Sequence, residues 1–231
     1  EIAQKLGIFV VFPTYERGPE RGVVYNSAAL IDPRGEMIGV YRKTHLFPTE
    51  RKSAGGWSTP GTQPVVIETE LGVMVLEFFP DVAPNHVARF KELAYEGFYD
   101  NTAFHRIVKG FMIQGGNPET KIGDKSRAVT PLKAEFNKKP HVRGSLSAAR
   151  TNDPNSATSQ FFICLDRTPH LDGQYTNYGQ LIAGGDVLMK LGDMETKMNP
   201  YGEKSEPAKR ATVKKVYITS REEGLKAAGA K

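Results

Sequence analysis

A single arginine occurs among apolar side chains in residues 104–116, and a glutamine follows it closely. This stretch is Phe-His-Arg-Ile-Val-Lys-Gly-Phe-Met-Ile-Gln-Gly-Gly. If it forms two strands that turn at Lys109 and Gly110, alternation brings Arg106, Met112 and Gln114 onto one concave face. A cation and an amide beside apolar side chains suit the binding of a peptide. An ordinary core hairpin with one solvated arginine is the alternative for this segment alone.

Two later blocks have the composition and order found in a known family. Residues 159–164 are Ser-Gln-Phe-Phe-Ile-Cys, and residues 171–175 are Leu-Asp-Gly-Gln-Tyr, followed by Tyr178 and Gly179. Together with residues 104–116, they make the chain similar to the cyclophilin-type peptidyl-prolyl isomerases over about residues 65–219. The resemblance implies an enzyme that accelerates rotation about X-Pro peptide bonds and assists protein folding. It also implies proline-containing peptides and unfolded proteins as partners, and neither a cofactor nor a metal ion.

Rotation about an X-Pro bond requires a particular kind of stabilisation. The rotation disrupts amide resonance over a barrier of about 20 kcal/mol, and no covalent bond is cut. In the twisted amide the proline nitrogen becomes pyramidal and basic. A guanidinium group remains charged at physiological pH and donates hydrogen bonds in a fixed fork, so it can meet this transient lone pair. We therefore expect Arg106 to be the catalytic residue, in line with the arginine of the family.

The resemblance also implies the residues that bind the substrate. Phe111, Met112, Phe162 and Leu171 match positions that line the slot for the proline ring, and Gln114 would orient the substrate backbone. Plain core packing is the alternative for each apolar member. The other residues that the resemblance assigns to the site are His105, Ala149, Arg150, Gln160, His170 and Tyr175, of which Ala149, Arg150 and Gln160 would border a neighbouring subsite.

Two of these positions depart from the best-known pattern of the family. His170 occupies the position where many members have a tryptophan, and Tyr175 the position where they have a histidine. Loss of the indole N–H predicts weak binding of cyclosporin-like ligands. Tyr175 retains an aromatic wall and a hydroxyl group, so we expect the proline slot to persist.

The pattern of apolar residues predicts a mainly β fold around this site. Residues 65–78 alternate as a hairpin that turns near residues 70–72, and residues 211–219 form a closing strand. A helix is expected to start at Pro84 and to stop before Gly97, with Val87, Phe90, Leu93 and Ala94 at helical spacing. Asp186 is expected to cap a second, shorter helix. Many strands with two helices fit a closed antiparallel barrel. The resemblance implies the same architecture, an eight-stranded barrel capped by two helices.

The first sixty residues carry a second resemblance. Residues 25–32 and 41–47 are similar to part of a nitrilase-type carbon–nitrogen hydrolase, whose catalytic lysine would match Lys43. That family needs a glutamate base and a cysteine nucleophile. Leu76 falls about where the cysteine is required, and the region that would supply the glutamate is expected to be absent. Catalysis by this segment is therefore not expected, and Lys43 and His45 are interpreted as surface residues.

This interpretation divides the chain into three parts. We expect a truncated nitrilase-like segment at residues 1–62, an isomerase domain at residues 63–222 and a flexible tail at residues 223–231, with the seam between Pro60 and Val75. Residues 7–14 are expected to form a buried strand, residues 23–31 and 37–43 two more, and residues 53–61 a linker. Lacking neighbours, these strands would expose apolar surface unless they dock or self-associate. An irregular extension without an inherited role is the alternative for residues 1 to about 60.

The composition limits which partners, cysteine-based sites and locations are expected. The net charge of +5 comes from basic residues spread along 231 residues, which favours a solvated surface over a nucleic-acid interface. The single cysteine, Cys164, excludes an internal disulfide or a cysteine-based zinc site. No apolar stretch is long enough to span a membrane, so no membrane partner is expected and the cytoplasm is the default location. A proline-binding module without turnover, or a remnant hydrolase, are the alternative functions.

Overall fold

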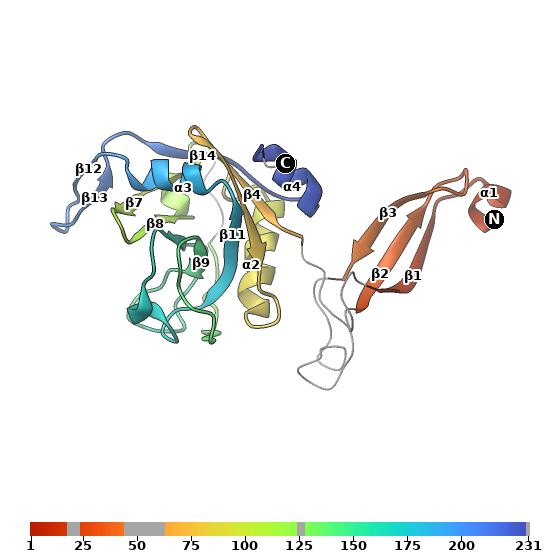
Figure 1. The fold of residues 1–231 in the computed structure, drawn as a ribbon, viewed down its shortest axis with the longest axis horizontal. Coiled ribbons are helices and arrows are strands. Elements are labelled where there is room, and N and C mark those ends of the chain that lie inside the picture. The colour runs from red at the N-terminus through yellow and green to blue at the C-terminus, as the bar shows by residue number, and fades with distance from the viewer. Residues whose placement is uncertain (18–23, 44–62, 124–127, 230–231) are drawn as a thin grey trace. The chain divides into compact units, whose positions relative to one another are not determined.

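The chain forms two compact units, Glu1–Thr62 and Gln63–Lys231. The computed structural model describes residues 1–17, 24–43, 63–123 and 128–229 (Figure 1). The expected linker at residues 53–61 and His45 lie outside the described residues. Among the described residues, no helix is long and apolar enough to cross a membrane.

The first unit contains a three-stranded antiparallel sheet with the order β1-β2-β3. Its elements are α1 (Ile2–Leu6), β1 (Val10–Arg17), β2 (Val24–Ile31) and β3 (Met37–Arg42). The predicted turn after β2 is present, since the backbone N–H of Gly35 donates to the carbonyl of Asp32 at 2.9 Å. The first strand is not buried as expected, because Val11 is 66% exposed and Phe12 is 56% exposed. Among the described residues of this unit, the three strands have no second layer over these side chains.

The second unit contains most of the secondary structure. Its elements in chain order are β4 (Val65–Thr69), β5 (Gly72–Phe78), α2 (Pro84–Tyr95), β6 (Thr102–Phe104), β7 (Arg106–Val108), β8 (Met112–Gly115), the 3-10 helix η3 (Pro118–Thr120), β9 (Ser145–Ala148), β10 (Phe161–Cys164), the 3-10 helix η4 (Pro169–Leu171), β11 (Asn177–Ala183), α3 (Gly185–Gly192), β12 (Thr196–Met198), β13 (Lys204–Pro207), β14 (Ala211–Ile218) and α4 (Arg221–Ala227).

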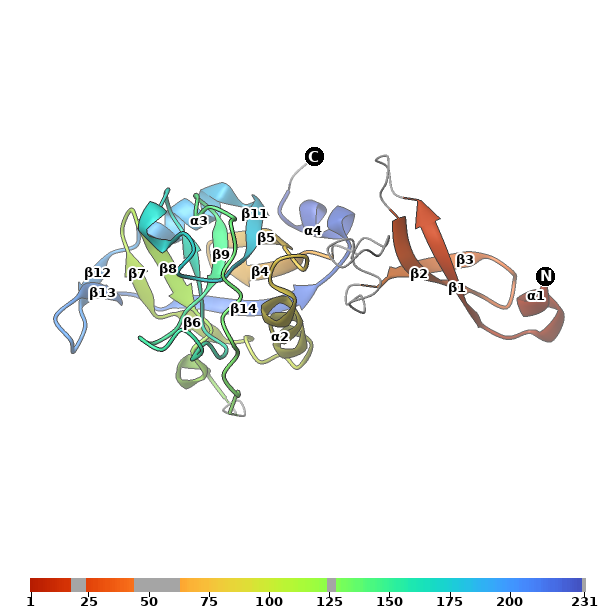
Figure 2. The same cartoon turned by 90° about the horizontal axis from the view of Figure 1, so that it is seen from below.

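Nine of these strands form one antiparallel sheet that closes on itself. Its order is β6-β14-β4-β5-β11-β9-β10-β8-β7. The two strands at the ends of this order, β6 and β7, are separated in the chain only by His105. Counted as one interrupted strand, they close an eight-stranded barrel, which confirms the predicted fold. Helices α2 and α3 lie against the barrel strands (Figures 1 and 2).

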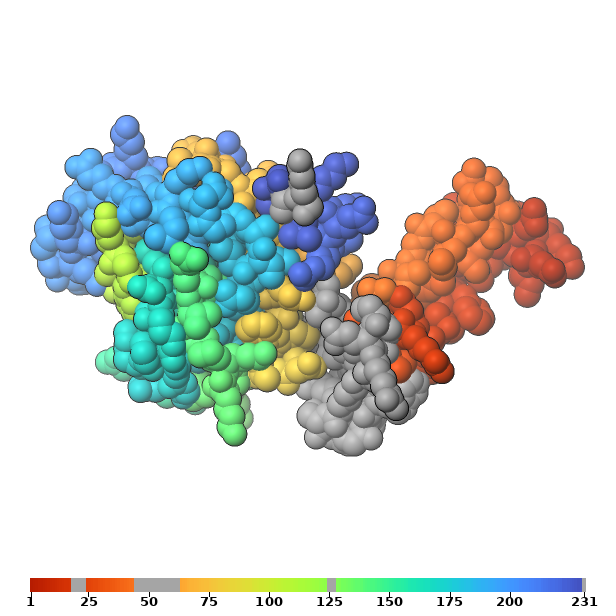
Figure 3. Space-filling view, viewed as in Figure 1, coloured from red at the N-terminus to blue at the C-terminus, as the bar shows by residue number. Residues whose placement is uncertain are grey.

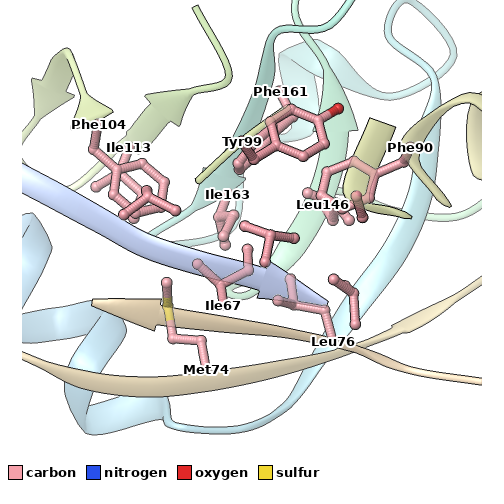
Figure 4. Close-up of a cluster of buried hydrophobic side chains, with 14 of the residues drawn as sticks. Ile67, Met74, Leu76, Phe90, Tyr99, Phe104, Ile113, Leu146, Phe161 and Ile163 are labelled. Carbon is pink, nitrogen blue, oxygen red and sulfur yellow. The ribbon is translucent and has the colours of Figure 1, made fainter. Parts of the chain in front are cut away.

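The core of the second unit is an apolar cluster inside the barrel (Figure 4). Phe161 lies at its centre, with ring centroids 5.3 Å from Phe90, 5.6 Å from Tyr99 and 6.1 Å from Phe104. All three pairs have the edge-to-face geometry that aromatic quadrupoles favour. This packing fixes β10, whose next residue, Phe162, belongs to a second and smaller cluster.

The helix boundaries follow the predicted signals in part. Helix α2 begins at Pro84 as expected, and the chain leaves it at Gly97, whose φ is +64°. The predicted cap of the shorter helix is wrong. Gly184 is the N-cap of α3, while the carboxylate of Asp186 lies within the first turn and pairs with Lys190 at 2.9 Å. This is the favourable spacing for an acidic residue four positions before a lysine.

Two elements near the C-terminus were not predicted. Residues 221–227, most of which were assigned to a flexible tail, form α4. Ser220 and Glu223 build a capping box at its start, in which each side chain accepts a hydrogen bond from the backbone of the other. The second element is the two-stranded sheet of β12 and β13, which lies outside the barrel sheet.

Candidate active site

The hairpin of β7 and β8 brings Arg106, Met112 and Gln114 together. Arg106 pairs with Gln114 across the two strands, and Val108 pairs with Met112. Gly110 adopts a φ of +72° in the connecting turn, a conformation that glycine adopts without strain. The Arg106 Nη1 group donates to Gln114 Oε1 at 3.3 Å and lies 4.0 Å from Met112 Sδ. The alternation of residues 106–114 therefore produces the predicted shared face.

A hollow of about 180 Å³ lies beside this face. Its apolar floor is the small cluster that includes Met112, Phe162 and Leu171, each of them buried. The rings of Phe162 and Tyr175 meet nearly at right angles, with centroids 5.7 Å apart. The lining residues are Arg106, Phe111, Met112, Gln114, Ala149, Arg150, Phe162, Leu171 and Tyr175. This pocket is apolar below and polar at the rim, as expected for a site that holds a small ring beside a polar backbone.

Two elements far along the chain form the wall opposite Arg106. Strand β10 pairs with β8 so that Phe162 lies directly across from Gln114. Leu171 ends the 3-10 helix η4, where its backbone N–H donates to Thr168 at 3.0 Å. The N–H of Tyr175 then donates to the carbonyl of Leu171 at 3.1 Å, which folds the tyrosine back onto the pocket.

A second hollow of about 210 Å³ adjoins the first. Gln114, Ala149 and Arg150 line both hollows, whereas Gln160 lines only the second. The side chain of Gln114 donates to Gln160 Oε1 at 2.9 Å, and the guanidinium of Arg150 lies 4.3 Å from the centre of the Tyr175 ring. The three residues assigned to a neighbouring subsite thus lie together, next to the apolar pocket.

Two of the assigned residues, His105 and His170, line neither the apolar pocket nor the hollow that adjoins it. The ring of His170 packs against Phe111, with centroids 5.4 Å apart and an angle of 31° between the planes. His105 instead lines a separate hollow of about 810 Å³, which lies on the other side of Arg106 and also includes Glu203. Burial lowers the pKa of His105, which favours its neutral form.

Glu203 is a residue of the site that the sequence did not reveal. Its carboxylate accepts from Arg106 Nε and Nη2, each at 2.7 Å. Hydrogen bonds from Arg106 and Ser205 lower the pKa of Glu203 to about 2. The two residues are 97 positions apart, so local spacing gives no signal for their pairing.

A second ionic group, made up of His141, Arg167 and Asp172, contacts the apolar wall of the pocket. The Asp172 carboxylate accepts from the backbone N–H of His141 at 2.7 Å and pairs with Arg167. The hydrogen bond from Arg167, followed by that from the His141 backbone, holds the pKa of Asp172 well below its usual range. The His141 ring stacks on Phe162 with centroids 6.2 Å apart. Asp172 follows Leu171, so this group fixes both apolar residues of the wall.

The described residues that could bind a metal ion or act as a nucleophile are not arranged for either role. Among the described residues, no group of three or more His, Cys, Asp or Glu side chains is placed to hold a metal ion. Burial raises the pKa of the Cys164 thiol to about 11, so it is not an activated nucleophile. Leu76, at the position where a hydrolase cysteine would be required, is fully buried in β5. Lys43 is half-buried and its backbone N–H donates to Asn26 at 2.7 Å.

Two family models match the chain. The model of the cyclophilin type peptidyl-prolyl cis-trans isomerases matches residues 64–220, and that of the carbon-nitrogen hydrolases matches residues 1–88. The matches overlap at residues 64–88, where the structure has the β4–β5 hairpin and the start of α2. Both predicted resemblances are thereby confirmed.

Individual relatives agree with the first of these models. A probable peptidyl-prolyl cis-trans isomerase of Brucella abortus is 42% identical over 137 residues, which cover 55% of this chain and 70% of the relative. A peptidyl-prolyl cis-trans isomerase-like 1 of Neurospora crassa is 38% identical over 167 residues, covering 71% of this chain and 98% of the relative. A crystal structure of a cyclophilin type isomerase from Cryptosporidium parvum, determined in the presence of the dipeptide Ala-Pro, covers 69% of this chain and 100% of its own, with a TM-score of 0.60 and 32% identity.

Proposed function

Because this chain belongs to the cyclophilin-type peptidyl-prolyl cis-trans isomerases, we propose that its pocket holds the proline ring of an X-Pro peptide while Arg106 stabilises the twisted amide. The observation that carries this proposal is the position of the Arg106 guanidinium at the rim of the apolar pocket, beside Gln114. The relative crystallised in the presence of Ala-Pro supports the same class of ligand.

The geometry suits rotation about a bond better than its cleavage. Met112, Phe162 and Leu171 offer an apolar surface to the proline ring and contain no group that could attack a carbonyl carbon. Holding the ring still leaves the preceding carbonyl free to swing. The Arg106 Nη1 group then donates to the proline nitrogen, whose lone pair is available only when amide resonance is lost. Because this contact is stronger in the transition state than in the ground state, it accelerates the rotation.

Replacing Arg106 tests the proposal directly. We expect Arg106→Ala to lower kcat/KM for an Ala-Pro peptide by roughly 10²- to 10³-fold, the usual cost of removing one transition-state hydrogen-bond donor. Exchange spectroscopy by NMR or a protease-coupled assay measures the rate. Arg221→Ala is the matched control, because Arg221 also pairs with a carboxylate, Glu77, but lies outside the pocket. Equal rates for wild type and Arg106→Ala would refute the proposal.

The same assay separates catalysis from simple capture of proline peptides. A binding module would retain peptide affinity and show no acceleration in either protein. Binding without turnover by the wild type would therefore leave Arg106 without a catalytic role.

We also propose that cyclosporin-like ligands bind weakly. The imidazole of His170 packs on Phe111 and provides no indole N–H beside the pocket. We expect a dissociation constant far above the nanomolar range for the wild type, and tighter binding for His170→Trp, both measured by calorimetric titration. Nanomolar affinity of the wild type would contradict this proposal without affecting that for Arg106.

A further inference from the structure

Arg106 is held by two partners that lie on different sides of its guanidinium group. The Nε and Nη2 atoms donate to the two carboxylate oxygens of Glu203, each at 2.7 Å, and Nη1 donates to Gln114. A carboxylate that accepts two parallel hydrogen bonds fixes the plane of a guanidinium group, since both are flat and match in width. Glu203 therefore determines which edge of Arg106 faces the pocket.

The backbone around Glu203 is itself fixed. Asn199 Oδ1 accepts from the backbone N–H of Glu203 at 2.9 Å and from that of Tyr201 at 2.9 Å. The backbone N–H of Asn199 donates to the carbonyl of Glu203 at 2.8 Å, and its side chain donates to Ser205 at 3.2 Å. These bonds hold the loop between β12 and β13 in one conformation, so the backbone that carries the Glu203 carboxylate has a defined position.

The segment that carries Glu203 is attached to the hairpin of the active site at two points. Besides the pair between Arg106 and Glu203, Lys109 in the β7–β8 turn pairs with Asp193 at 2.9 Å. Strand β13 lies beside β7, and the blue atoms of the β12–β13 hairpin adjoin the yellow-green atoms of that region in Figure 3. The hairpin is not part of the barrel sheet. Its position beside Arg106 therefore adds a contact that barrel closure does not require.

Stability alone does not account for this pair. The side chains of Arg106 and Glu203 are 34% and 40% exposed, so water screens the pair, and its contribution to the free energy of folding is modest even with the two-point geometry. Orientation is different, because a small displacement of a catalytic group reduces the rate strongly. Besides its bonds to Glu203 and Gln114, Arg106 has a second Nη1 hydrogen whose acceptor is the Met112 sulfur at 4.0 Å, a weak acceptor that a substrate can replace.

We propose that Glu203 is a positioning residue for the isomerase reaction, which holds the Nη1 edge of Arg106 toward the proline pocket. This inference rests on the proposed catalytic role of Arg106. It predicts that removal of the carboxylate lowers the rate of the rotation step and has little influence on the binding of the peptide.

The test compares substitutions within one hairpin. We expect Glu203→Ala to lower kcat for an Ala-Pro peptide about tenfold with KM changed less than about twofold. Glu203→Gln retains the shape and one acceptor, so its kcat is expected between those of wild type and Glu203→Ala. Glu206→Ala is the matched control, because Glu206 lies in the same hairpin and pairs with Lys197 at 3.0 Å. Its kcat is expected to equal that of wild type.

A double-mutant cycle then separates positioning from a merely structural role. If Glu203 acts through Arg106, Glu203→Ala has no further effect in the Arg106→Ala background. An equal tenfold loss in both backgrounds, a thermal midpoint that falls together with kcat, or an unchanged or higher kcat for Glu203→Ala would overturn the inference. If instead Arg106→Ala itself has no effect, the proposed function fails, so the two failures are distinguishable.

Discussion

The two units of this protein differ in how far their apolar side chains are buried. In the second unit, residues such as Ile67, Leu76 and Ile163 are fully buried inside a closed sheet. In the first unit, Phe12 and Val40 are 56% and 44% exposed on a sheet that is also rich in apolar residues. The comparison shows that apolar strands alone do not make a core. A closed barrel packs its inner face against itself, whereas a three-stranded sheet needs a second layer.

The β4–β5 hairpin shows where the two units divide. Both family models include these residues. In the structure, β4 pairs with β14 and β5 pairs with β11, so both strands belong to the barrel. The hairpin therefore contributes Ile67, Met74 and Leu76 to the barrel core. The β4–β5 segment thus matches both family models, and in the structure it is part of the closed barrel sheet.

The largest expected difference between the units concerns two phenylalanines. Phe161 is 1% exposed at the centre of the barrel core, and Phe12 is its exposed counterpart in β1. We expect Phe161→Ala to lower the free energy of unfolding of the barrel by about 3–5 kcal/mol through loss of burial and creation of a cavity. We expect Phe12→Ala to change that of the first sheet by no more than about 0.5 kcal/mol. Hydrogen exchange of the amides in each unit measures both values.

The Phe12 variant also tests whether the two units really differ in the burial of their apolar residues. If Phe12→Ala destabilises its sheet by several kcal/mol, that face is covered in solution and behaves as a core. A small effect of Phe161→Ala would contradict the barrel packing itself.

A smaller difference is expected between two glycines that share a left-handed backbone. Gly184 before α3 has a φ of +84°, and a Cβ there would lie 2.2 Å from the Val73 carbonyl oxygen. Gly7 after α1 has a φ of +62°, and a Cβ there would meet no other atom within 4 Å. Both alanine variants incur about 1–2 kcal/mol of backbone strain. Only Gly184→Ala adds a clash, so we expect about 3 kcal/mol or more for Gly184 and about 1 kcal/mol for Gly7.

Urea unfolding of the barrel and hydrogen exchange of α1 measure these two effects. Equal costs would show that the barrel accommodates the added methyl group by moving β5, in contradiction to tight packing of α3 on that strand.

The sequence was sufficient for the parts that depend on local pattern. The alternation at residues 106–114 predicted the face shared by Arg106, Met112 and Gln114, and the helical spacing after Pro84 predicted α2. The capping box of Ser220 and Glu223 is also a local signal, and it would have predicted α4 in place of a flexible tail.

Other features depend on contacts between distant residues. Glu203 meets Arg106 across 97 positions, and Asp172 meets His141 across 31. Neither pairing follows from propensity or periodicity, because it is the tertiary fold, and not the local sequence, that brings these segments together. For β1 the sequence supported both a buried strand and apolar surface exposed for lack of neighbours, and the structure shows the exposed form. Its apolar run is typical of a buried strand, but burial also requires a neighbour that covers it.

The smallest expected effect comes from removing the first unit altogether. A chain that begins at Gln63 retains Pro64, whose carbonyl accepts from the N–H of Thr219 at 3.2 Å, and it retains the entire barrel core. All residues of the proposed site lie between His105 and Glu203. We therefore expect kcat/KM for an Ala-Pro peptide to stay the same, and the free energy of unfolding of the barrel to change by less than about 1 kcal/mol.

Removal of α4 provides the contrasting control. Gly224 of α4 lies against Val66 and Val75, and a Cβ on it would meet the Val75 side chain at 3.1 Å. Deleting residues 221–231 uncovers these two fully buried valines and should lower the free energy of unfolding by about 1–3 kcal/mol. If the deletion of residues 1–62 costs as much, the first sheet stabilises the barrel as a second layer. If it costs nothing, the closed barrel is independent of the strands that precede it.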